Sequence, residues 1–201
     1  MRGRVVLASA SARRRDLLAQ AGLDFEVRPI DVPEELAEFD DPVRACSSLA
    51  RRKALARAAT LTDEAFVIGA DTVVAIDGAG GWQLLGKPRD AGHAAVMLAS
   101  LSQTRHLVAT GVCVVRTPGG EPITEAERTW VHMRSIEAGE VAEYVASGEW
   151  RGKAGGYAIQ ETADRFVEAL EGGGFDNVVG LPVELTLALL RSAGWAPPTE
   201  G

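Results

Sequence analysis

The pattern of apolar and polar positions changes period several times along the chain, which predicts strands interspersed with helices. The predicted strands are short apolar or β-branched runs bounded by turn residues: 5–8, 25–30, 66–76, 82–85, 106–116 and 123–134. The predicted helices carry apolar residues at helical spacing: one around 13–18 that ends at Gly22, a long one from Pro42, and segments 89–101, 138–146 and 182–192. Asp41 before Pro42 is typical of a helix start, and the acidic stretch 31–41 before it predicts a loop.

Hairpins stand beside strand–helix units in this succession, which favours an α/β fold with a mixed, twisted sheet and flanking helices. The chain shows no internal repeat and no low-complexity linker. We therefore predict a single domain over 1–194, with two lobes around a cleft and a shallow division near residues 30 and 137. An apolar-rich stretch lies at 166–170, and residues 195–201 are predicted to form a flexible tail.

The composition narrows the class of protein. Hydrophobic residues make up 46% and charged residues 24% of the 201 residues, which is typical of a globular domain. The net charge of -7 argues against a nucleic-acid partner, so any phosphate must be held by a local basic cluster. The N-terminus does not have the order of a signal peptide, and no run approaches the roughly 18 apolar residues of a spanning helix. We expect a cytoplasmic protein without a membrane partner, in which Cys46 and Cys113 are reduced and buried.

The first group of candidate site residues lies where the first strand passes into the first helix: Ser9, Ser11, Arg13 and Arg14. Exposed amides at a helix N-terminus favour an anion, and two hydroxyls and two guanidiniums there could bind phosphate oxygens. The alternative is a serine-capped helix whose arginines are only solvated.

The second group is Asp71 and Thr72, inside the β-branched run 66–76. A carboxylate is costly to bury among apolar residues unless it is paired or binds a cation, so Asp71 is a candidate general base or metal ligand. We expect Gly69 and Ala70 to leave room beside it for a ligand. The alternative is a structural aspartate held by an arginine or by backbone amides.

Three separated lysines, Lys53, Lys87 and Lys153, acquire a meaning only if the fold brings them together. Lys153 lies in a glycine-rich stretch that suggests a flexible phosphate cradle but lacks the order of a P-loop. The acidic pair Glu34 and Glu35 fits either a solvated loop or a carboxylate offered to a metal. The histidines fall at no ligand spacing and are interpreted as structural.

Six ordered sequence blocks together resemble the Maf family of nucleotide pyrophosphatases. They are LASASARR at 7–14, ARRKA at 50–54, IGADT at 68–72, LGKP at 85–88, KAGGYAIQ at 153–160 and VGLP at 179–182. The resemblance implies a fold related to that of the house-cleaning inosine triphosphatases. It also implies hydrolysis of the α–β phosphoanhydride of a nucleoside triphosphate with Mg²⁺ or Mn²⁺ as cofactor, usually by a homodimer.

By matching position, the resemblance makes Asp71 the proton acceptor that activates water, and Glu34 an assistant to the metal or the water. It assigns contacts with the phosphates to Ser9, Arg13, Arg14, Lys53 and Lys87. Arg13, Thr72 and Gln160 match positions linked to base choice, and Thr72 with 157–160 is similar to the subfamily that prefers dTTP and UTP. An amide at Gln160 could read the hydrogen-bonding edge of a pyrimidine.

Three positions depart from the family pattern: Ala12 stands in place of a proline, Gly156 in place of an alanine, and Glu161 in place of a glycine. Because Glu161 adds negative charge near the expected base pocket, one alternative is a preference for 7-methyl-GTP or other modified nucleotides. A second alternative is a nucleotide-binding regulator of cell division without catalysis. A third is a small α/β binding module whose basic residues are surface charges.

Overall fold

The computed structural model describes residues 3–36 and 39–197. Residues 37–38 and 198–201, which belong to the predicted loop and tail, lie outside the described residues. The elements follow in the order β1 (Arg4–Leu7), α1 (Ala12–Gln20), β2 (Glu26–Val27), α2 (Pro42–Ala58), β3 (Ala65–Gly78), β4 (Gly81–Leu85), α3 (Ala91–Leu101), β5 (Arg105–Thr117), β6 (Ile123–Met133), α4 (Ala138–Ser147), η2 (Ala154–Gly156), η3 (Thr162–Phe166), β7 (Val167–Glu171), α5 (Phe175–Val179) and α6 (Val183–Ser192).

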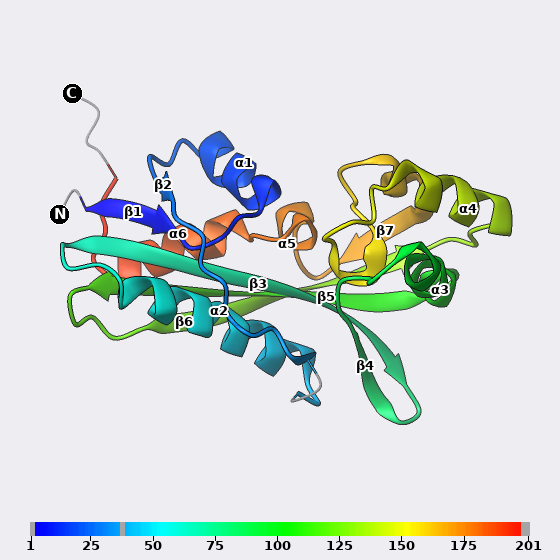
Figure 1. Ribbon diagram of the computed structural model, residues 1–201, viewed down its shortest axis with the longest axis horizontal. Coiled ribbons are helices and arrows are strands. Elements are labelled where there is room, and N and C mark those ends of the chain that lie inside the picture. Colours follow the sequence, from blue (N-terminus) through cyan, green and yellow to red (C-terminus); the bar gives the residue numbers. More distant parts are fainter. Residues whose placement is uncertain (1–2, 37–38, 198–201) are drawn as a thin grey trace.

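The strands form one mixed sheet in the order β2-β1-β3-β5-β6-β7, with β4 also paired to β3. β1 pairs in parallel with both β2 and β3, whereas β3, β5, β6 and β7 pair antiparallel in succession. The long strands β3, β5 and β6 run through the length of the molecule, and β1 and α6, the first and last described elements, lie at the same end of it (Figure 1). The predicted α/β fold with a mixed sheet is confirmed.

Helix α2 covers one face of the sheet, and α1 and α6 cover the other (Figure 1). α2 lies unusually close to β3 and β5, because glycines face it at the contact. A Cβ added at Gly69 would lie 2.3 Å from the Ala50 carbonyl oxygen, and one at Gly111 would lie 2.5 Å from the Cys46 carbonyl oxygen. The expectation that Gly69 leaves room for a ligand is therefore wrong, because the α2 backbone fills that space.

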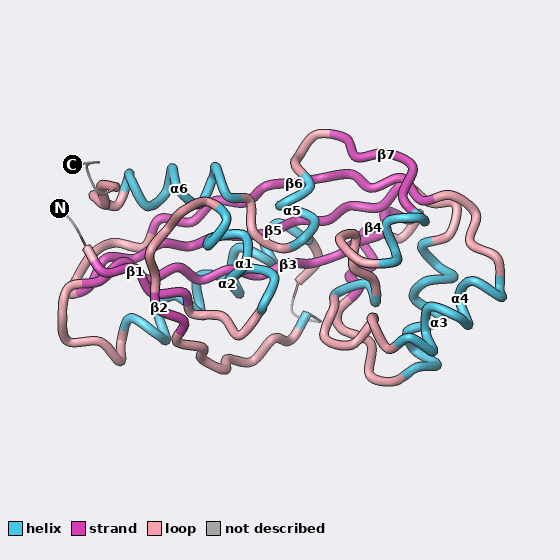
Figure 2. The backbone as a smooth tube through the Cα atoms, turned by 90° about the horizontal axis from the view of Figure 1, so that it is seen from above, coloured by secondary structure: helices cyan, strands magenta, loops and turns pink. Residues whose placement is uncertain are grey.

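Alternation along β3 sends successive side chains to opposite faces of the sheet. Val67 packs with residues of α2, whereas Phe66 and Ile68 pack with Leu18 of α1 and Leu190 of α6. Helices α3 and α4 lie at the opposite end of the molecule from β1 and α6 (Figure 2). A further core cluster there includes Leu98, Tyr144 and Phe166. The core thus extends over both faces of the sheet.

Most element boundaries agree with the sequence patterns, and side-chain caps explain the helix starts. Ser11, Asp41 and Asp90 each accept a hydrogen bond from a backbone amide of the first helical turn. β2 is shorter than predicted because it has only the four-residue β1 as a partner and pairs through two residues. The short helix α5 was not predicted, since five residues carry too little periodicity.

Residues 195–197 of the predicted tail belong to the described part of the chain. The backbone amide of Trp195 donates to the Leu190 carbonyl oxygen, and its side chain packs against the core cluster that contains Leu190. Within the described part of the chain, no helix is long and apolar enough to cross a membrane.

Candidate active site

A cleft of about 1040 Å³ opens where β3 lacks a neighbouring strand along one edge. On that edge β1 pairs with Ala65 to Ile68 and β4 pairs with Val74 to Gly78. Between these two partners, no described strand pairs with the edge over residues 69–73. Asp71 and Thr72 lie in this gap and both line the cleft, although their side chains leave opposite faces of the strand.

The Asp71 side chain belongs to an ion-pair cluster with Lys53 and Glu34. Lys53 Nζ lies 2.5 Å from Asp71 Oδ1 and 2.6 Å from Glu34 Oε1, and Lys87 Nζ lies 2.8 Å from Glu34 Oε2. Lys53 extends from α2, which the contact at Gly69 brings close to β3. Asp71 is therefore paired, as the cost of burying a carboxylate requires, and its partner is a lysine that itself lines the cleft.

Lys53 and Lys87 stabilise the negative charge of Glu34. Burial by itself raises the pKa of Glu34, but hydrogen bonds and attraction from Lys53 and Lys87 outweigh it and lower the pKa to about 2. Glu34 is therefore ionised at neutral pH. Of the acidic pair, Glu34 lines the cleft, and Glu35 is not among the described residues that line it.

The Arg14 guanidinium connects three separate segments at the opposite wall. Its Nε donates to the Gly180 carbonyl oxygen at 2.8 Å, one terminal nitrogen donates to Ser9 Oγ at 3.2 Å, and the other donates to Thr72 Oγ1 at 3.1 Å. Burial lowers the pKa of Arg14, an effect opposed by the carboxylates of Asp71 and Glu34. Arg14 thus supports the site structurally as well as contributing positive charge.

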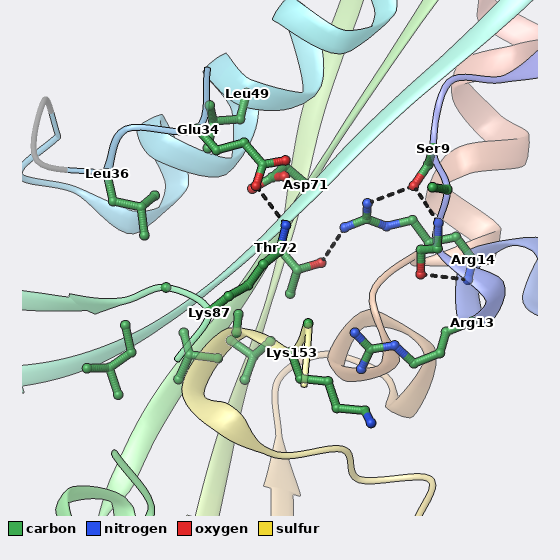
Figure 3. Close-up of a pocket in the computed structure, with 18 of the residues that line it drawn as sticks. Ser9, Arg13, Arg14, Glu34, Leu36, Leu49, Asp71, Thr72, Lys87 and Lys153 are labelled. Atoms are coloured by element: carbon green, nitrogen blue, oxygen red, sulfur yellow. Dashed lines mark hydrogen bonds and ion pairs between the residues drawn. The ribbon is translucent and has the colours of Figure 1, made fainter. Parts of the chain in front are cut away.

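Ser11 and Arg13 complete this wall of the cleft. Ser11 Oγ accepts the Arg14 backbone amide at 3.4 Å, which caps α1, and the Ser11 amide donates to Ser9 Oγ at 3.3 Å. The Arg13 side chain points into the cleft (Figure 3), and no hydrogen bond or ion pair joins its guanidinium to another described residue. Burial lowers the pKa of Arg13, and the neighbouring Arg14 lowers it further. Arg13 is therefore a cation available for an anionic ligand.

The glycine-rich stretch around Lys153 forms a third wall. Gly155 and Gly156 are buried, and their positive φ angles of 68° and 74°, which are outside the helical range, give this stretch a tight turn. The Gly155 amide donates to the Gly86 carbonyl oxygen at 3.1 Å, which fastens this turn to the loop that carries Lys87. The three scattered lysines do converge on one cleft.

All the predicted site residues except Gln160 line the cleft: Ser9, Ser11, Arg13, Arg14, Glu34, Lys53, Asp71, Thr72 and Lys87. Gln160 is exposed and is not among the residues that line the described cleft, so its assignment to base choice stays a prediction. Its neighbours Tyr157 and Glu161 do line the cleft. The sequence block at 153–160 was the signal for this wall, but periodicity could not tell which of its side chains face inward.

Tyr157 was not predicted as a site residue, and a buried histidine fixes its hydroxyl. His106 Nε2 and the Tyr157 hydroxyl are 2.8 Å apart, and the two rings meet edge to face. Burial lowers the pKa of His106 to about 3, so the imidazole is neutral. The interpretation of His106 as structural agrees with this contact.

The donor set of the cleft suits a hard divalent cation. Two carboxylates, Asp71 and Glu34, contact one ammonium, so their oxygens already converge on a single positive charge. Among the described residues, no group of three or more histidine, cysteine or acidic side chains could enclose a metal ion. Mg²⁺ is commonly held by one or two carboxylates, with substrate phosphates and water completing its shell, and these residues fit that mode of binding.

Convergent cations beside paired carboxylates, in a cleft at the carboxyl end of a parallel strand, are features typical of phosphate-binding α/β proteins. The model of the family described as Maf-like protein matches residues 4–193, and the chain belongs to that family.

Relatives over nearly the whole chain carry a common name. The "dTTP/UTP pyrophosphatase" of Anaeromyxobacter dehalogenans (strain 2CP-1) is 44% identical over 100% of this chain and 99% of its own. That of Rhodospirillum rubrum is 45% identical over 99% and 92%, and that of Thermoanaerobacter sp. (strain X514) is 42% identical over 94% and 95%. A solved nucleoside-triphosphatase / dITP/XTP pyrophosphatase of Mycobacterium abscessus is 22% identical and covers 66% of this chain and 75% of its own, with a TM-score of 0.43, which is too remote a likeness to support an argument.

Proposed function

We propose that this protein is a nucleoside triphosphate pyrophosphatase that hydrolyses the α–β phosphoanhydride of dTTP or UTP to the monophosphate and pyrophosphate. The observation that carries the proposal is the convergence of cationic side chains from four segments on one cleft that also contains paired carboxylates. Family membership and the names of the relatives support the same reaction.

The cations would stabilise the charge that accumulates on the leaving pyrophosphate. Arg13, Lys87 and Lys153 reach the cleft from three different segments, so they can contact several phosphate oxygens at once. The amides at the start of α1 add hydrogen-bond donors beside Ser9 and Ser11. The triphosphate would therefore lie along the wall formed by α1 and the two lysine-bearing loops.

Asp71 would accept the proton of the attacking water, and Lys53 would orient the carboxylate for that role. A buried carboxylate whose one oxygen is bound by an ammonium keeps its other oxygen for the water. Mg²⁺ or Mn²⁺ held by Asp71 and Glu34 would supply charge neutralisation at the phosphates. The mechanism needs no histidine or cysteine.

Base choice would depend on Thr72 and on the wall that contains Tyr157. The Thr72 hydroxyl contacts Thr110 Oγ1 at 3.0 Å and accepts from Arg14, so its orientation is fixed by the fold. Gln160 would have to turn inward to read a pyrimidine edge. The structural support is thus stronger for phosphate binding than for the dTTP and UTP preference, which rests on the relatives.

Pyrophosphate release from dTTP, UTP, CTP, 7-methyl-GTP and inosine triphosphate, with Mg²⁺, with Mn²⁺ and without metal, tests the proposal. We expect metal-dependent turnover of dTTP and UTP that is lost in Asp71→Asn. Turnover confined to 7-methyl-GTP would retain the reaction and overturn the pyrimidine preference. Folded protein that binds nucleotide but releases no pyrophosphate would support a regulatory role instead. Light scattering would test the expected homodimer, and fractionation of the source cells the expected cytoplasmic location.

A further inference from the structure

One side chain in the cleft has a charge opposite to that of the cations around it and takes no part in the proposed reaction. Glu161 Oε2 lies 2.9 Å from Lys153 Nζ. The same ammonium donates to the Glu149 carbonyl oxygen, and only 12% of the Lys153 side chain is exposed. Lys153 and Glu161 both line the cleft. Lys153 is therefore already paired with an anion before any phosphate enters.

Glu161 acts on a second cation as well. Burial and the neighbouring Arg14 lower the pKa of Arg13, and attraction to the Glu161 carboxylate opposes this effect. Figure 3 shows Arg13 and Lys153 entering the cleft from different elements. The Glu161 carboxylate is thus an anion in the cleft that pairs with Lys153 and also attracts Arg13.

We propose that Glu161 tunes the affinity of this cleft for polyphosphates by competing with them for Lys153. The inference rests on the proposed function for the identity of the substrate. The Lys153 ammonium already donates to the Glu149 carbonyl oxygen and to Glu161, so a phosphate oxygen that binds it shares its charge with the Glu161 carboxylate or displaces that carboxylate. Glu161 is accordingly a positioning residue that weakens binding of the nucleotide and of the pyrophosphate product, and so favours product release.

Glu161→Gln removes the charge and keeps the shape of the side chain, which accepts a hydrogen bond from Lys153. We expect pyrophosphate to bind this variant roughly two- to fivefold more tightly at low ionic strength, the ordinary size of a partly exposed ion pair. The difference should shrink as salt is added. For the nucleotide, KM should fall while kcat does not rise. The thermal midpoint of Glu161→Gln should equal that of the surface variant Glu168→Gln.

The experiment is titration calorimetry with pyrophosphate as the probe, on four proteins: wild type, Glu161→Gln, Lys153→Met and the double variant. In the Lys153→Met background the glutamine substitution should change the affinity less than twofold. Glu168→Gln, an exposed position on β7, removes the same charge outside the cleft lining and should leave the affinity unchanged.

Unchanged or weaker binding by Glu161→Gln would overturn the proposal. If Glu161→Gln tightened pyrophosphate binding equally in the wild-type and the Lys153→Met backgrounds, the proposal would also be overturned. The effect would then come from the net charge of the protein and not from the pair with Lys153. The calorimetry requires no turnover, so this result is separate from the test of hydrolysis. A chain that hydrolyses dTTP but shows no Glu161 effect keeps its proposed function and loses only this inference.

Discussion

Replacing Lys53 by methionine should destabilise the protein more than the same replacement of Lys87, the other lysine that contacts Glu34. Methionine has a similar length and apolar stem, so the change removes the ammonium and little volume. Loss of the Lys53 ammonium leaves the Asp71 and Glu34 carboxylates close together without the cation that both contact. The Lys53 and Asp71 side chains are only 9% and 11% exposed, so water cannot replace the missing charge.

Breaking a buried ion pair by removing one partner costs about 3–5 kcal/mol. Because the cluster borders a cleft and 35% of the Glu34 side chain is exposed, the lower end of that range applies. A loss of about 3 kcal/mol lowers the melting temperature of a protein of this size by roughly 6–12 °C. The matched control is Lys87→Met, which removes the same charge from a side chain that is 56% exposed and should cost at most about 1 kcal/mol.

Thermal unfolding of both variants at pH 7 and pH 5 measures the effect. Without Lys53 the pKa of Glu34 rises, because burial opposes its ionisation. The folded variant then takes up a proton at a higher pH than the folded wild type does, so its deficit should be smaller at pH 5 than at pH 7. Added Mg²⁺ should restore more stability to Lys53→Met than to the wild type, because a cation can replace the ammonium.

Equal melting temperatures for Lys53→Met and Lys87→Met would refute this reasoning, since burial would then make no difference. A deficit that is the same at both pH values would also contradict it, because the loss would be one of packing rather than of charge.

Three further outcomes follow from the packing and from buried titratable groups. Gly69→Ala should lose about 1–3 kcal/mol in urea unfolding, because its Cβ would overlap the α2 backbone, whereas Gly78→Ala, with its nearest atom at 3.7 Å, should lose much less. The Cys46 thiol, whose pKa burial raises to about 12, should resist iodoacetamide at pH 8 in the native protein and react in urea; rapid native labelling would show that the site opens. Burial lowers the pKa of His106 to about 3, so below about pH 6.5 the unfolded chain binds a proton that the folded chain does not. The free energy of unfolding should therefore fall between pH 6.5 and pH 3, by up to about 1.4 kcal/mol per pH unit. His106→Gln should remove this contribution to the slope.

The local sequence determined the elements and their starting points. Side-chain period distinguished β3 from α2 and placed the starts of α1, α2 and α3 to within two residues. Ser11, Asp41 and Asp90 cap these helices in the structure, and of the three Asp41 was the helix start predicted from the sequence. The strand-to-helix passage at Ser9 indicated phosphate chemistry because helix amides are a local property of the chain. Each of these features depends on neighbours a few residues away, which a single sequence displays directly.

Only the tertiary structure decided which charges meet. Lys53, Asp71 and Glu34 lie on a helix, a strand and a loop, and the close approach of α2 at Gly69 brings them together. Residue type indicated that Asp71 needed a partner, but not that the partner would be Lys53. Pairing across such separations depends on sheet order and helix packing, which no local period encodes.

The site itself exists because two strands stop short of each other. β1 and β4 pair with the same edge of β3 and leave residues 69–73 uncovered, so Asp71 and Thr72 reach one cleft from opposite faces of a strand. The sequence by itself determined that this strand carries an acid and a hydroxyl side by side. Strand register and the lengths of its partners, which are set by long-range packing, decided that both side chains open onto the same space.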